Sequence, residues 1–310
     1  MFGYNLVTAM HSDVVLVSNE SDALAVYQAT NEQIPALVVP DLTTTQSDDW
    51  QRFPILAQIF KGFRLGEMTI LTGNTGCGKS TFLSEYSLDL CEQNVSTLWC
   101  NLESSNSRLV SVMVQQYARK GFGPGDSEFD FWYNKLMSLP MYFTHIDSST
   151  TNSIIINSLI LTHGVQHVIV DNLQWMASLS GAEHSPQNEI SARYNGDQRV
   201  DALCTYFQRL TREKQVHVTL VIHPEIENEE TGVSFTALHG NELKAFQQAD
   251  NVLVMQRKIS RSKDNVREKC LQVWKNRFAG EVIYSDRLLM LFDSRTKCHR
   301  VVNRKFSRSD

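Results

Sequence analysis

The chain has 310 residues and a hydrophobic fraction of 42%, which is ordinary for a folded globular protein. Its longest apolar runs, such as Ile154–Ile156, fall far short of the roughly 20 residues that a transmembrane helix needs, so a transmembrane protein is excluded. No Lys or Arg precedes Arg52, and we expect neither a secretory signal nor an Arg-rich transit peptide. The six cysteines form no CxxC pair and no zinc-spaced cluster, which indicates reduced thiols of an intracellular protein.

The net charge of −5 is unevenly distributed along the chain. From Arg257 onward 15 Lys and Arg residues oppose 6 Asp and Glu residues, whereas the first 256 residues hold 14 basic and 28 acidic ones. Such a division is typical of a face that meets nucleic acid or nucleotide phosphate. A solvated basic tail explains the excess equally well, and both interpretations stay open.

The first forty residues predict a strand, a helix and a strand, at Val14–Val17, Ser21–Ala29 and Ala36–Val39. A polar linker follows, and then Trp50–Phe60 predicts a short amphipathic helix that begins near Pro54 and exposes an apolar side. From Gly66 onward strands and helices alternate, which predicts an α/β fold with a mostly parallel sheet covered on both faces. The predicted strands are Met68–Thr72, Thr97–Leu102, Met141–Thr144, His167–Val170, His217–Ile222 and Asn251–Met255; the predicted helices are Lys79–Gln93, Ser107–Lys120, Phe129–Leu136, Asn152–Thr162 and Val200–Lys214.

Strands without intervening helices follow Asn251 and predict an antiparallel C-terminal extension, with members at Lys269–Trp274, Glu281–Tyr284 and Arg287–Phe292. Two polar stretches, Ser178–Asp197 and Glu225–Leu238, predict loops.

One motif carries the strongest chemical signal. Gly73–Ser80 reads Gly-Asn-Thr-Gly-Cys-Gly-Lys-Ser and matches G-x-x-x-x-G-K-[ST], between an apolar strand and a predicted helix. Its glycines let backbone N–H groups turn toward phosphate oxygens, Lys79 reaches the β- and γ-phosphates, and Ser80 holds Mg²⁺. The pattern predicts a nucleotide site.

Polar residues at the ends of other predicted strands extend this site. Asp171 ends the strand after His167 and is a candidate to hold Mg²⁺ through water, although a strand-terminal Asp is also a good cap. Glu103 is a candidate general base that orients the attacking water, or else caps the following helix. His223 is a candidate phosphate sensor or a structural residue. Arg277 is a candidate arginine finger supplied in trans.

Together these residues resemble the Twinkle family of mitochondrial replicative DNA helicases, within the RecA-like superfamily of phage-type and DnaB-type helicases. The resemblance covers about residues 50–280 and rests on the segments Phe53–Gly62, Gly66–Phe82, Ser84–Cys91, His167–Gln174, His217–Pro224, Ala249–Leu253 and Leu271–Phe278. It implies an ATP-dependent (or other NTP-dependent), Mg²⁺-requiring 5′→3′ DNA helicase with a RecA-like P-loop NTPase core. The implied partners are single-stranded and forked DNA, further copies in a hexameric or heptameric ring, a replicative polymerase and a single-strand-binding protein. The implied location is the mitochondrial matrix and nucleoid.

The resemblance also assigns residue roles by position. It implies catalysis by Glu103, Lys79, His223 and Arg277, and metal binding by Ser80 and Asp171. The implied nucleotide-binding residues are Gly73, Asn74, Thr75, Gly76, Cys77, Gly78, Lys79, Ser80, Thr81, Arg257 and Lys275, and the implied DNA-binding residues are Gly240, Asn241 and Lys244. Phe292 is a candidate to stack on the base, although its spacing favours core packing. The predicted domains are a degenerate Toprim-like remnant at 1–40, a linker and subunit-docking helix at 41–62, a RecA-like helicase motor at 63–295 and a basic tail at 296–310.

Two alternatives stay open. The acidic stretch after His223, with Glu225 in place of a basic residue, and the change to Asn241 weaken the expected DNA contacts, so the chain could be a nucleotide-binding DNA-binding or assembly module without unwinding activity. A strand-exchange ATPase is the other alternative, but the Trp274–Phe278 segment and the linker helix favour the helicase arrangement.

Overall fold

The computed structural model describes residues 51–144, 149–179, 196–224, 240–259 and 267–304, and two short strands nearer the N-terminus. The chain divides into two compact units, residues 1–48 and 49–310. In the first unit β1 (Val15–Val17) and β2 (Ala36–Val38) pair in parallel, at the two positions where strands were predicted. The helix predicted between them lies outside the described residues, and so does most of the segment interpreted as a Toprim-like remnant.

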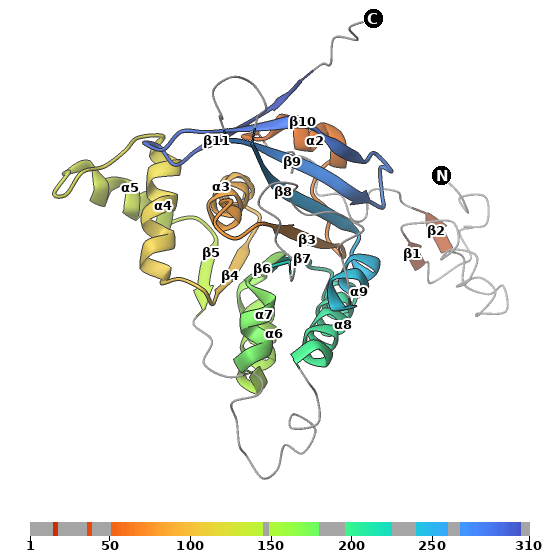
Figure 1. The fold of residues 1–310 in the computed structure, drawn as a ribbon. Coiled ribbons are helices and arrows are strands. Elements are labelled where there is room, and N and C mark those ends of the chain that lie inside the picture. Colours follow the sequence, from red (N-terminus) through yellow and green to blue (C-terminus); the bar gives the residue numbers. More distant parts are fainter. Residues whose placement is uncertain are drawn as a thin grey trace, which may run out of the picture. The chain divides into compact units, whose positions relative to one another are not determined.

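In the described part of the second unit, one nine-stranded sheet has the order β11-β10-β9-β8-β3-β7-β6-β4-β5 (Figure 1). The pairs from β8 to β5 are parallel, whereas β9, β10 and β11 continue the sheet in antiparallel fashion from β8. The predicted fold class, an α/β sheet with an antiparallel C-terminal extension, is therefore confirmed. The strands are β3 (Met68–Gly73), β4 (Thr97–Asn101), β5 (Met141–Thr144), β6 (His167–Asp171), β7 (His217–Ile222), β8 (Asn251–Ile259), β9 (Arg267–Asn276), β10 (Ile283–Phe292) and β11 (His299–Asn303).

Helices cover both faces of this sheet, which is why its central strands are apolar along their whole length (Figure 1). Every residue of β3, β4, β6 and β7 is buried. Two apolar clusters form the core, one on each face. One face carries α2 (Pro54–Phe60), α3 (Lys79–Glu92), α4 (Asn106–Ala118) and α5 (Glu128–Met137), and the other carries α6 (Ser149–His163), α7 (Leu173–Leu179), α8 (Gly196–Lys214) and α9 (Gly240–Gln248).

Three C-terminal predictions differ from the structure. The two strands predicted at 281–284 and 287–292 are one strand, β10, whose pairing register with β9 shifts between Ile283 and Leu288. The polar residues Ser285 and Asp286 lie at this irregularity, which explains why the sequence pattern resembles a break. The basic tail predicted at 296–310 is also wrong for its first half, because residues 299–303 form β11 and pair with β10.

The helix α2 begins at Pro54, as predicted, but its apolar side is not exposed. Leu56, Ile59 and Phe60 are buried in the core cluster that α2 shares with α3 and α4 on one face of the sheet. The Phe53 ring lies 5.2 Å from the ring of Phe82 on α3. The expectation that this apolar side is exposed is therefore wrong, and the docking of the helix on a neighbouring subunit stays a prediction. Pro54 and Gln58 are the exposed residues of the helix, and Ile55 and Ala57 are partly buried against the same cluster.

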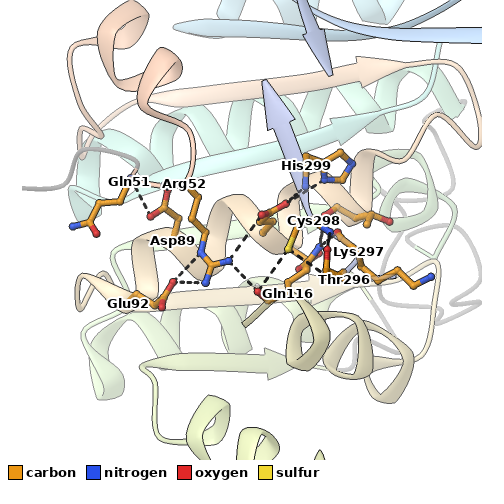
Figure 2. Close-up of polar contacts among 12 residues, drawn as sticks. Gln51, Arg52, Asp89, Glu92, Gln116, Thr296, Lys297, Cys298 and His299 are labelled. Carbon is orange, nitrogen blue, oxygen red and sulfur yellow. Dashed lines mark hydrogen bonds and ion pairs between the residues drawn. The ribbon is translucent and has the colours of Figure 1, made fainter. Parts of the chain in front are cut away.

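A polar network fastens the residues before α2 to α3, α4 and the start of β11 (Figure 2). Arg52 donates from Nε and Nη2 to Glu92 and from Nη1 to the carbonyl of Gln116 at 3.0 Å. Gln116 in turn donates to the carbonyls of Thr81 and Lys297, both at 2.9 Å. The P-loop helix α3 is thus tied to segments from both ends of this unit.

Asp89 anchors the same network through the backbone. Its two carboxylate oxygens accept from the N–H groups of Gln51 at 3.1 Å and Arg52 at 2.8 Å. Burial raises the pKa of Asp89 to about 6, even though these two N–H donors and the charge of Arg52 act to lower it.

This raised pKa predicts a pH-dependent stability. The contribution of Asp89 is fully present below pH 4, where the carboxyl is protonated in both states, and it is lost as the pH rises through 6. A shift of about two units in the pKa of Asp89 corresponds to a change of up to about 3 kcal/mol in the free energy of unfolding. We expect urea unfolding to show that the Asp89→Asn variant gains stability relative to the unsubstituted protein between pH 4 and pH 7. Asp130→Asn, which removes an exposed carboxylate from α5, controls for the lost charge; an equal gain there would contradict the prediction.

Candidate functional site

The phosphate-binding loop follows β3 at the centre of the sheet. Gly73, with φ at 142°, passes so close to β8 that a Cβ there would lie 2.1 Å from the carbonyl oxygen of Met255. Gly78 caps the start of α3 in a left-handed conformation, with φ at 101°. Only glycine tolerates the close approach at position 73 and the left-handed backbone at position 78, and the backbone path therefore explains why both residues are glycine. The loop then presents the N-terminus of α3, which favours negative charge.

Lys79 and the polar loop residues are held close to the loop backbone. The Lys79 ammonium is buried and donates to the carbonyls of Gly73 at 2.7 Å and Asn74 at 3.2 Å. Asn74 and Cys77 are also buried, and burial raises the pKa of the Cys77 thiol. Cys77 therefore behaves as a packed loop residue.

Asp171 lies at the end of β6, next to the first turn of α3. Its carboxylate is hydrogen-bonded to Ser80, and Oδ1 is buried without a hydrogen-bond partner in the described part of the chain. Burial is the largest cause of a raised pKa of about 6 at Asp171; the charge of Glu103 also raises this pKa, whereas the hydrogen bond to Ser80 and the charge of Lys79 lower it. A hydroxyl beside a carboxylate with a free buried oxygen fits Mg²⁺, which prefers oxygen ligands.

Glu103, at the end of β4, contacts two other candidate residues. Its Oε2 accepts from Asn172 Nδ2 at 2.8 Å and lies 3.3 Å from His223 Nε2. The other ring nitrogen of His223 lies 3.5 Å from the hydroxyl of Thr75 in the phosphate loop. Three neighbouring parallel strands and the loop thus bring Glu103, His223 and Thr75 together, as expected from the shared edge of strand ends. Sequence reasoning missed Asn172, although its place directly after Asp171 was a usable signal.

Glu103, His223, part of the phosphate loop and the start of α3 line one cavity of about 380 Å³. Its walls are Gly76, Gly78, Lys79, Ser80, Thr81, Glu103, Ser104, Arg108, Leu109, Val112 and His223. The three residues from α4 were not predicted, because the rotation of α4 about its axis depends on tertiary packing. The cavity combines cations, a carboxylate and the loop backbone, an arrangement suited to a bound polyphosphate and a water molecule beside it.

A second group of basic residues flanks the loop from the antiparallel strands. Arg257, on β8, donates to the carbonyl of Gly76. Its cross-strand partner Lys269 was not predicted; its ammonium lies 3.4 Å from the position of a Cβ at Gly78 and 5.3 Å from the centre of the Phe292 ring. Burial lowers the pKa of Lys269, and the charge of Arg257 lowers it further. Phe292 is 40% exposed, so the expectation of core packing is wrong.

Arg277 and Lys275 lie at the other end of the central strand. Arg277 forms an ion pair with Asp250 at 2.7 Å, and Asp250 accepts from the backbone N–H of Met68, the first residue of β3. Lys275 donates to the carbonyls of Phe246 and Gln247 at the C-terminus of α9. Because β3 extends over roughly 17 Å, neither side chain contacts the phosphate loop of its own chain.

The secondary structure at the candidate DNA-binding residues differs from the loop that was predicted. Gly240, Asn241 and Lys244 lie on α9 and not in a loop, and Lys244 forms an ion pair with Asp201 on α8 at 2.5 Å. Most of the two stretches interpreted as DNA-facing loops, 178–197 and 225–238, lies outside the described residues. The DNA-binding role of this region stays a prediction.

The fold and the site together define a RecA-like P-loop NTPase fold. A family model described as "AAA domain" (AAA_25) matches residues 33–229. The chain belongs to this AAA domain family. None of the helices in the described ranges is long and apolar enough to cross a membrane.

Two solved structures share the fold. The ATPase domain of G40P superposes with a TM-score of 0.66 at 13% identity, covering 93% of this chain and 100% of that one. A KaiC-like protein from the hyperthermophilic archaeon Pyrococcus horikoshii OT3 superposes with a TM-score of 0.55 at 14% identity, covering 81% of this chain and 96% of that one. These likenesses bear out the predicted RecA-like core.

Proposed function

We propose that the chain is an ATP-hydrolysing, ring-forming 5′→3′ DNA helicase of Twinkle type that acts in mitochondrial DNA replication. The observation that carries the proposal is the separation of Arg277 from the phosphate loop along β3. An exposed guanidinium at the opposite end of the central strand serves a nucleotide site only when a second copy places it there. A site shared between copies is what a ring ATPase requires.

The residues around the cavity support hydrolysis of a terminal phosphate. The loop backbone and Lys79 bind the phosphates, and Ser80 and Asp171 would hold Mg²⁺, which neutralises charge on the β- and γ-oxygens when bound. Glu103 orients a water molecule for attack and takes its proton, while Asn172 keeps the carboxylate in place by its 2.8 Å hydrogen bond. His223 lies between this carboxylate and Thr75, where it can respond to the terminal phosphate.

A second function, nucleotide-dependent assembly on DNA without unwinding, has one observation in its favour. Four glutamates occur among residues 225–230, shortly after His223 in the sequence. Negative charge there opposes contact with DNA phosphates and lowers affinity. This function keeps the same nucleotide site and the same shared arrangement of copies.

Steady-state ATP hydrolysis, measured with and without single-stranded DNA, tests the proposal. We expect hydrolysis that DNA stimulates, followed by unwinding of a duplex that bears a 5′ single-stranded tail. The Lys79→Ala variant is the blank, because it removes the buried ammonium from the phosphate loop. Nucleotide binding without hydrolysis, or hydrolysis that ignores DNA, would favour the assembly module.

A further inference from the structure

Gln174 contacts the site through the backbone of His223. Its carboxamide donates from Nε2 to the His223 carbonyl at 2.7 Å, and its Oε1 accepts from the His223 N–H at 3.2 Å. Gln174 lies in the first turn of α7, three residues after Asp171. One side chain therefore satisfies both the donor and the acceptor of the residue that carries the imidazole.

The end of β7 explains why this contact is needed. The ladder between β7 and β3 ends at the pair Ile222–Thr72, and the ladder between β7 and β6 ends at Leu220–Val170. His223 thus follows the last paired position on both sides of its strand. A primary amide has the donor and acceptor of a peptide group, so the side chain of Gln174 takes the place of a strand neighbour at His223, three residues beyond the last β7 residue that pairs with β6.

The segment after β6 also positions Glu103, the carboxylate that lies beside the His223 imidazole. Asn172, two residues before Gln174, donates to Glu103, and its Oδ1 accepts from the N–H of Trp175 at 2.8 Å. The segment after β6 therefore fixes the Glu103 carboxylate through Asn172 and the His223 backbone through Gln174. The 3.3 Å separation of His223 Nε2 from Glu103 depends on both contacts.

We propose that Gln174 is a positioning residue for hydrolysis, which acts by holding the backbone of His223 so that the imidazole stays between Glu103 and Thr75. This inference rests on the proposed function, because it concerns the same site. Gln174 is not itself among the residues that line the cavity, and its two hydrogen bonds go to the backbone of His223 and not to the phosphate loop. Its loss is therefore expected to slow the reaction without weakening nucleotide binding.

The test compares Gln174→Met with the unsubstituted protein in ATP hydrolysis and in binding of a fluorescent ATP analogue. Methionine has a similar length and removes both hydrogen bonds. We expect kcat to fall by roughly 10- to 100-fold, since small displacements at an active site have effects of this order, while KM and analogue affinity change less than about twofold. Gln208→Met is the matched control: Gln208 is half-buried on α8 and bonds the carbonyl of Gln248, far from the cavity.

A double-mutant cycle with His223→Ala separates positioning from a general loss of structure. If Gln174 acts through His223, the double variant loses no more activity than His223→Ala alone. Additive losses, a kcat no lower than that of Gln208→Met, or weakened analogue binding would each overturn the inference. Failure of the proposed function is a different result, because the unsubstituted protein would then show no more hydrolysis than Lys79→Ala.

Discussion

The Arg277→Ala variant is expected to lose ATP hydrolysis by about 10³- to 10⁵-fold, the range that arginine fingers contribute. Nucleotide binding by the isolated chain should stay nearly unchanged, because Arg277 lies at the end of β3 opposite to the phosphate loop. Arg277→Lys should recover little activity, since an ammonium lacks the planar fork of the guanidinium. Steady-state hydrolysis and equilibrium binding of an ATP analogue check both parts.

Mixing experiments then test whether the site is shared. In rings that combine Arg277→Ala with Lys79→Ala subunits, some interfaces join an intact phosphate loop to an intact arginine, and activity should return at those interfaces. Arg287→Ala, which removes a partly exposed arginine from β10, is the control for loss of one positive charge. Mixed rings that recover no activity would contradict the shared arrangement.

The second large effect is expected at Glu103. Glu103→Gln keeps the size of the side chain and still accepts a hydrogen bond from Asn172, but it cannot take a proton from water. We expect hydrolysis to fall by about 10²- to 10⁴-fold, the usual contribution of a general base, with ATP binding retained. Single-turnover hydrolysis measured beside binding of an ATP analogue separates the two effects.

Glu128→Gln provides the matched control, because Glu128 is an exposed carboxylate paired with Lys120 on the surface. It should hydrolyse ATP at the unsubstituted rate. Near-normal hydrolysis by Glu103→Gln would mean that another group activates the water, and the assignment of Glu103 as the base would then be wrong.

The central sheet could be predicted from sequence because its signals are local. Each strand from β3 to β8 is an apolar run, and the unbroken Gly-Lys-Ser motif between β3 and α3 fixes the place of the loop. The ends of β4, β6 and β7 follow from the same pattern, so the meeting of Glu103, Asp171 and His223 could be anticipated. The contact of Gln174 with His223 could not, since amide contacts have no sequence period, whereas Asn172 was missed although it directly follows Asp171.

The errors concern features that depend on distant packing. The strand β11 reads His-Arg-Val-Val-Asn, and only its pairing with β10 distinguishes it from a charged tail. The start of α9, at Gly240, resembles a turn because glycine favours turns more than helices. The apolar side of α2 could not be assigned to its own core or to a neighbour without the position of α3. The inclusion of Arg108 in the cavity wall likewise depends on how α4 is rotated.

The link between β11 and the P-loop helix has a consequence for the order in which the chain is made. Glu85, on α3, is 3% exposed and accepts from the backbone N–H of His299 at 2.6 Å. His299 follows Glu85 by 214 residues in the sequence, so the ribosome adds this donor long after the carboxylate. Until then, burying it carries the free-energy cost of an incompletely compensated charge. The contact between α3 and β11 therefore forms only after residues 299–303 have been synthesised and have paired with β10.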